Sequence, residues 1–188
     1  VGNFSIFAGG STTSAGNNAG VSNVVDLYNS ATGTWSTAQL SVARIALAAT
    51  SVGSVALFAG GSGVTDLSAA VDLYNSATGT WSTAQLSVAR VDHAAASVGN
   101  LAIFAGGQNA GGVDSIVDVY DSTTGTWSTA RLSVARSRLA ATSVGNMALF
   151  AGGEIVWQGS SSRCVSFREC SLLRLSCLFL RAAVLQPF

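Results

Sequence analysis

The chain has 188 residues, of which 48% are hydrophobic and only 10% are charged, and its nine acidic residues balance nine basic residues that are all arginine. A charge content this low and this balanced excludes the basic surface that nucleic acids and anionic membranes require, and the absence of lysine excludes P-loop and Schiff-base chemistry. The sequence also lacks the run of about 18 apolar residues that a membrane-spanning helix needs, so no transmembrane segment is predicted.

Short strands are predicted from the first residues onward. Residues 3–10 read NFSIFAGG, an apolar run closed by a glycine pair, and a complete unit follows further along the chain. The strands of that unit are predicted at Ala46–Val52, Val55–Gly61, Ala69–Asn75 and Thr80–Leu86, with the turn SATG before the last of them. No helical period appears in the unit, which predicts an all-β fold.

The same unit recurs along the chain. The stretch VDLYNSATGTWSTAQLSVAR occurs at residues 25–44 and again at residues 71–90, and a close copy occupies residues 117–136, so the period is 46 residues. The first interval between glycine pairs is longer by five residues, and the extra residues fall within residues 11–23, which predicts a surface loop there. Four short strands in about 46 residues is the size of a β-propeller blade.

Four landmarks recur in register in these units: an arginine, a glycine pair that closes a strand, a tyrosine and a tryptophan. The positions are Gly60, Gly61, Gly106, Gly107, Tyr28, Tyr74, Tyr120, Trp35, Trp81, Trp127, Arg44, Arg90 and Arg136. This pattern resembles the kelch repeat over residues 1 to about 153. The resemblance implies an all-β, kelch-type β-propeller that is incomplete, with about three four-stranded blades plus a partial blade.

The blades are predicted from these landmarks. They are a partial first blade at residues 1–40, a second at 44–86, a third at 90–132 and a partial fourth at 136–153. Residues 154–188 lose the repeat and form a tail that is either disordered or a short helix. An open arc of blades leaves faces and edges exposed, so further blades are expected from a longer chain or from a second copy, whose Ala140–Val144 would complete the first blade.

The recurring residues are expected to build the blades. Glycines allow the sheets to approach closely near the axis, and each tryptophan and tyrosine fills the wider space between blades. The recurring arginine is expected to bind backbone carbonyls between blades, although a ligand-facing cation in the channel mouth is the alternative. Asp26, Asp72 and Asp118 recur once per blade and are expected to bond to a turn or a neighbouring strand.

The copies differ in two places, in the triplet after the arginine and in the loop after the glycine pair. A rigid scaffold with variable loops is how binding surfaces are made, and in proteins similar to this one partners contact the same places. The candidate partner-binding residues are Asp92, Arg138, Asp66, Gln108, Asn109 and Asp114, and the alternative is that they are merely solvated. His93, the only histidine, is expected to be a packed strand residue, because Leu47 and Leu139 occupy its place in other units.

No catalytic constellation is visible in the repeats. One histidine and no repeat cysteine cannot assemble a multi-residue metal site, and no cofactor is predicted. The sequence therefore predicts a non-catalytic binding or scaffold module that recognises a protein or glycan partner through its loops. The alternative is a fragment of a carbohydrate-active, kelch-like propeller enzyme, which would need acids and an arginine clustered at the channel mouth, where Asp92 and Arg138 are the visible pair. The compartment is not indicated.

Overall fold

The computed structural model describes residues 1–12 and 20–155, and those residues form strands, turns and loops without a helix. The strands in chain order are β1 (Phe4–Ala8), β2 (Val24–Asn29), β3 (Thr34–Gln39), β4 (Ala48–Val52), β5 (Val55–Ala59), β6 (Ala70–Asn75), β7 (Thr80–Gln85), β8 (Ala94–Val98), β9 (Leu101–Ala105), β10 (Gln108–Asn109), β11 (Gly112–Val113), β12 (Ile116–Asp121), β13 (Thr126–Arg131), β14 (Ala140–Val144) and β15 (Met147–Ala151). No helix of the described residues is long and apolar enough to cross a membrane.

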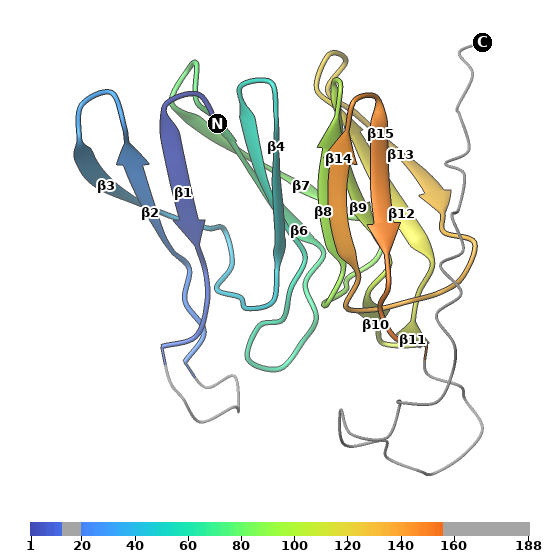
Figure 1. Ribbon diagram of the computed structural model, residues 1–188. Helices are drawn as coiled ribbons and strands as arrows, with labels where there is room; N and C mark the ends of the chain where they lie inside the picture. Colours follow the sequence, from blue (N-terminus) through green and yellow to red (C-terminus); the bar gives the residue numbers. More distant parts are fainter. Residues whose placement is uncertain (13–19, 156–188) are drawn as a thin grey trace, which may run out of the picture.

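The strands form successive antiparallel sheets that follow the chain (Figure 1). The second blade has the order β4-β5-β6-β7 and the third blade the order β8-β9-β12-β13, while the first blade holds only β1-β2-β3. The C-terminal hairpin pairs β14 with β15, and β10 with β11 form a small separate hairpin. The strands β4, β8 and β14 are neighbours, so each begins its sheet on the inner side of the array.

The predicted all-β, incomplete kelch-type propeller is confirmed by this arrangement. Two of the described sheets have the four antiparallel strands of a propeller blade, and the described sheets do not close into a ring. The separate residue limits predicted for each blade stay predictions. The tail predicted from residue 154 onward lies outside the described residues except for Glu154 and Ile155, and so does part of the predicted surface loop at residues 11–23.

Aromatic residues join the outer strands to each other. Tyr74 lies directly opposite Trp81 on the neighbouring strand, with the ring centroids 5.0 Å apart. Tyr120 and Trp127 repeat this pair in the third blade at 5.2 Å. Cross-strand aromatic pairs stabilise an antiparallel sheet by up to about 1 kcal/mol each, so the recurring tyrosine and tryptophan act within a blade as well as between blades.

The hydrophobic core is divided into layers between successive sheets. In one layer, Val25 and Leu27 of the first blade pack with Phe58 and Tyr74 of the second. The next layer joins the second blade to the third, and its buried members are Ala48, Val52, Leu57, Ala59, Val71, Leu73, Leu86, Ala102 and Phe104. Each blade therefore presents aliphatic side chains to the blade that follows it and aromatic side chains to the blade that precedes it.

The glycine pairs bind one blade to the next. The backbone N–H of Gly61 donates to the carbonyl of Arg90 at 2.9 Å, and that of Gly107 donates to Arg136 at the same distance. Gly60 has no room for a side chain, because a Cβ there would lie 2.6 Å from the Cε1 atom of His93 and 2.7 Å from the Arg90 carbonyl oxygen. The glycines thus permit the close approach of inner strands that the sequence suggests.

Replacing Gly60 by alanine is expected to destabilise the chain more than replacing Gly99. Both glycines have positive φ, 64° and 55°, but a Cβ on Gly99 would meet nothing within 4 Å. Backbone strain alone costs about 1–2 kcal/mol, and Gly60→Ala adds a collision with the next blade. Urea denaturation of both variants measures the difference in the free energy of unfolding. Equal losses would show that the blades are not held at this distance.

Candidate interaction surface at the loop end of the blades

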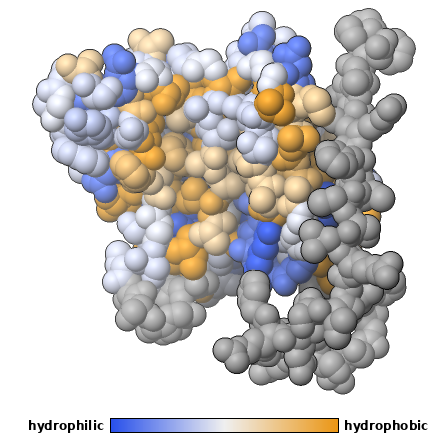
Figure 2. Space-filling view, in the orientation of Figure 1, coloured by the Kyte–Doolittle hydropathy of each residue, from blue (hydrophilic) through white to orange (hydrophobic). Residues whose placement is uncertain are grey.

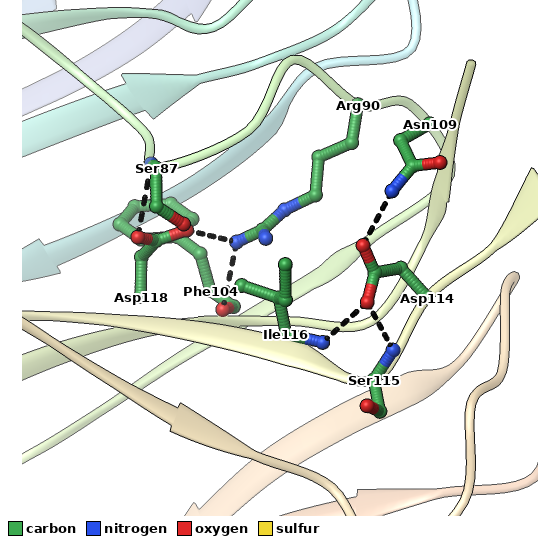
Figure 3. Close-up of polar contacts among 8 residues, drawn as sticks. All are labelled: Ser87, Arg90, Phe104, Asn109, Asp114, Ser115, Ile116 and Asp118. Carbon is green, nitrogen blue, oxygen red and sulfur yellow. Dashed lines mark hydrogen bonds and ion pairs between the residues drawn. The ribbon is translucent and has the colours of Figure 1, made fainter. Parts of the chain in front are cut away.

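Buried ion pairs hold the segments that lead into the second and third blades. The guanidinium of Arg90 binds the carboxylate of Asp118 at 2.6 Å and the carbonyl oxygen of Phe104 at 3.1 Å (Figure 3). The second carboxylate oxygen of Asp118 accepts the backbone N–H of Ser87 at 3.0 Å. Burial lowers the pKa of Arg90 below its usual value, and the charge of Asp118 opposes this change. The pair therefore joins the connection between blades to the third sheet.

The same pair occurs one unit earlier. Arg44 binds Asp72 at 2.7 Å and the Phe58 carbonyl at 2.9 Å, and Ser41 donates its N–H to Asp72. Both arginine side chains are fully buried. Sequence reasoning gave the arginine a role with carbonyls and the aspartate a role with a turn, and it missed that the two residues bind each other. The constant separation of 28 residues, repeated from unit to unit, is the signal that could have found the pair.

The positions two residues after these arginines have left-handed backbones. Ala46, Asp92 and Arg138 have φ of 52°, 57° and 56°, respectively. Aspartate tolerates this conformation better than alanine or arginine do, and strain of this kind is often found at functional sites. The turn leads into the inner strand of each sheet. The side chains at these positions therefore lie beside the inner strands, at the end of the array that carries the loops after the glycine pairs; we call this the loop end.

Two of the predicted site residues meet here. The Nε atom of Arg138 lies 3.4 Å from a carboxylate oxygen of Asp92, and its Nη1 atom lies 2.9 Å from Glu154. The backbone N–H of Arg138 also donates to the Asp92 carbonyl at 2.8 Å. The Arg138 side chain is 64% exposed. The cluster is thus a solvent-facing guanidinium between two carboxylates, and Glu154 is the member that sequence reasoning missed.

Gln108 lies closer to the inner strands than a loop position would suggest. It forms a bridge with Val91, which directly follows Arg90, and its amide donates to the hydroxyl of Ser137 at 3.2 Å. Ser137 is fully buried. Gln108 therefore connects the third blade to the segment that enters the C-terminal hairpin, beside the cluster around Arg138.

Asn109 and Asp114 bind each other across the β10–β11 hairpin (Figure 3). The other carboxylate oxygen of Asp114 accepts the backbone N–H groups of Ser115 and Ile116 at 2.6 and 3.0 Å. Because both of its oxygens are occupied, Asp114 fixes the shape of its own loop. Asn109 also has its amide oxygen bound to the N–H of Gly111 at 2.7 Å, so this hairpin is a rigid projection.

A groove separates this hairpin from the preceding blade's loop. Its volume is about 620 Å³, and its lining residues are Thr65, Asp66, Leu67, Val88, Ala89, Asn109, Ala110 and Gly111. Asp66 is exposed, and among the described residues its carboxylate accepts a hydrogen bond only from the hydroxyl of the neighbouring Thr65, at 2.7 Å. The groove thus brings two of the predicted residues, Asp66 and Asn109, to one site, whereas Asp92 and Arg138 form a second cluster nearer the inner strands.

His93 is buried behind this surface. Its ring lies 6.2 Å from that of Phe104, and neither ring nitrogen has a hydrogen-bond partner within residues 1–12 and 20–155. Burial, together with the nearby charge of Arg90, lowers the pKa of His93 from 6.5 to about 3. The histidine therefore stays neutral at physiological pH and packs against the glycine pairs between blades.

Comparison with known proteins adds one match. The kelch motif matches residues 89–131, which begin beside Arg90 and end with the last strand of the third blade. A search of the curated proteins finds no match to the chain. In the described part of the chain, no group of three or more histidine, cysteine, aspartate or glutamate residues could hold a metal ion. The match covers one unit of the chain, and the landmarks of that unit recur in the neighbouring units at the 46-residue period.

Proposed function

We propose that this chain is a non-catalytic binding module and that it recognises a segment of a partner protein in the groove between the loop of the second blade and the β10–β11 hairpin. A kelch motif indicates a propeller-type protein-interaction module. We therefore expect the partner to bind to the blades of this module. The observation that carries it is the groove itself, because it lies between variable loops of successive blades and is lined by Asp66 and Asn109.

The chemistry of the groove favours an extended peptide. Its lining includes the small and aliphatic side chains of Leu67, Val88 and Ala110. Asp66, also in the lining, offers a carboxylate with little local competition, so a partner side chain that is cationic or carries N–H donors would complement it. Binding sites commonly combine an apolar surface with a few placed polar groups, and the rigid β10–β11 hairpin keeps the second wall of the groove in place.

The proposal is tested with an array of immobilised peptides and glycans. The variant that combines Asp66→Ala with Asn109→Ala is expected to lose at least tenfold in affinity for the peptides that the unchanged chain binds, since a hydrogen bond to a charged group contributes about 1.5–3 kcal/mol. Gln85→Ala is the matched control, because Gln85 is an exposed polar residue on the outer strand β7, which does not line the groove.

Unchanged peptide binding by the double variant would contradict the proposed site. Binding of glycans, with no binding of peptides, would contradict the choice of a protein partner and would favour the carbohydrate alternative. In that case the cluster of Asp92, Arg138 and Glu154 becomes the place to test, because it holds the two carboxylates and the arginine that such a site would use.

A further inference from the structure

The connection between the second and third blades contains a stretch of unpaired backbone at Val88 and Ala89. The N–H groups and carbonyl oxygens of these residues have no hydrogen-bond partner within residues 1–12 and 20–155. Both residues are half-buried and line the groove between the loop of the second blade and the β10–β11 hairpin. Backbone polar groups that are withdrawn from solvent need a partner, and the main chain of a bound peptide offers the matching donors and acceptors.

The connection is anchored on both sides of this unpaired stretch. Immediately before it, the N–H of Ser87 donates to the carboxylate of Asp118 at 3.0 Å (Figure 3). Immediately after it, the N–H of Arg90 donates to the carbonyl oxygen of Ser68 at 3.2 Å. A stretch that is held at both ends keeps its position in the free protein, so binding a peptide there orders little additional chain.

The corresponding connection one unit earlier differs at one contact. There the Nη1 atom of Arg44 lies 3.5 Å from the carbonyl oxygen of Val42, which is the counterpart of Val88. The Nη1 atom of Arg90 is buried and has no partner in the described part of the chain. The arginine of its own unit therefore does not occupy the Val88 carbonyl, although residues 40–44 and 86–90 have the same sequence. The unpaired carbonyl is a feature of the connection that lines the groove.

The walls of the groove carry one charge. Asp66 is the only charged residue in the lining, and its carboxylate is exposed. Asn109 has both atoms of its amide bound within its own hairpin, so it shapes the wall and leaves Asp66 as the open acceptor. Hydrophobic and hydrophilic residues adjoin at the lower end of the array in Figure 2, which carries these loops in Figure 1. The groove therefore combines unpaired backbone, apolar surface and one carboxylate.

We infer that the groove recognises its partner through the main chain of an extended segment, which pairs with Val88 and Ala89 while one cationic side chain binds Asp66. The inference rests on the proposed function, because it concerns the same groove. It names the ligand class: a short stretch of uncharged, strand-forming residues with a single basic residue. In pairing of this kind, main-chain hydrogen bonds give the affinity. The volume of about 620 Å³ suits such a segment and not a folded domain.

The experiment uses the full chain and synthetic peptides of about seven residues, acetylated and amidated, with arginine at the centre and alanine, valine, threonine or serine elsewhere. In the peptide that binds most tightly, each backbone N–H is replaced in turn by an N-methyl group, and calorimetry measures the affinity. Neighbouring N–H groups of a strand point to opposite sides. Methylation is therefore expected to weaken binding by about tenfold at alternate central positions, with the positions between them serving as controls.

A charge reversal tests the part assigned to Asp66. The unchanged chain is expected to bind the arginine peptide about tenfold more tightly than the same peptide with glutamate at its centre. Asp66→Arg is expected to reverse this preference, which also shows that the variant is folded. Thr83→Arg is the matched control, because it adds the same charge at an exposed position of β7 that does not line the groove, and it is expected to keep the preference for arginine.

The inference and the proposed function fail in different ways. Peptide binding that the double variant of Asp66→Ala and Asn109→Ala leaves unchanged would contradict the groove as the site, and with it the inference. If the double variant loses binding, but N-methylation weakens binding at no position or equally at all positions, the groove stands and main-chain pairing is overturned. An unchanged preference for arginine in Asp66→Arg would overturn the assignment of the cationic side chain. Absence of binding by all arginine peptides would overturn the ligand class.

Discussion

Replacing Asp118 by alanine is expected to lower the free energy of unfolding by about 3–5 kcal/mol, the usual effect of removing one partner of a buried ion pair. The Asp118 side chain is 3% exposed, and its loss leaves the fully buried guanidinium of Arg90 without its carboxylate. The N–H of Ser87 loses its acceptor as well. Urea denaturation at fixed protein concentration measures the change.

The chain contains its own control for this experiment. Asp26 occupies the same position in the first blade, within a closely similar run of residues, but its carboxylate is exposed and has no ionic or hydrogen-bond partner among the described residues. Asp26→Ala is expected to change the free energy of unfolding by less than about 0.5 kcal/mol. Equal effects at the two positions would mean that the aspartate acts through the strand and not through its ion pair.

Replacing His93 by leucine is expected to make the chain markedly more resistant to acid. The folded chain holds the pKa of His93 at about 3, below the ordinary 6.5 of the unfolded chain. As pH falls from 6.5 toward 3, the unfolded chain binds a proton that the folded chain does not, so stability decreases by up to about 1.4 kcal/mol per pH unit. Leucine has no group that titrates, so the variant loses this dependence on pH. Its side chain is expected to fit the site of His93, since Leu47 and Leu139 occupy the equivalent positions.

The measurement is the free energy of unfolding of both proteins at pH 7, 5 and 4. Carboxylates titrate in this window in both proteins, and their contribution cancels in the difference. The advantage of His93→Leu should therefore grow as pH falls from 6.5. An advantage that stays constant with pH would show that the folded chain protonates His93 readily, and that the ring is less enclosed than its contact with Phe104 and Gly60 indicates.

The register of the repeat made most of the fold predictable. The alternation in polarity around Val71 and Leu73 predicted a strand because successive side chains point to opposite faces, but both faces of this strand are buried, since Asp72 and Tyr74 are buried as well. The glycine pairs and the aromatic landmarks then gave the order of strands within a blade. The two faces of a blade could not be assigned in this way, because the sequence does not say which neighbour each face meets.

The candidate site was predictable only as a set of variable positions. Asp66 and Asn109 were chosen because their loops differ between units, and the structure places both on one groove. Asp114 was chosen for the same reason, yet its carboxylate binds the backbone of its own loop. Variation marks where a loop is free to change, whereas the hydrogen bonds that occupy a side chain depend on how that loop folds.

By itself, the sequence determined the all-β class, the 46-residue unit and the strands within it, since these depend on the period of apolar residues and on turns that are local in the chain. Only the tertiary structure decided that Arg90 binds Asp118, that Glu154 joins Arg138, and that Phe7 is exposed while Phe58 is buried. Residues at equivalent positions of the units differ in burial because burial depends on the neighbouring sheet. The local sequence of a unit does not specify which neighbouring sheet is present.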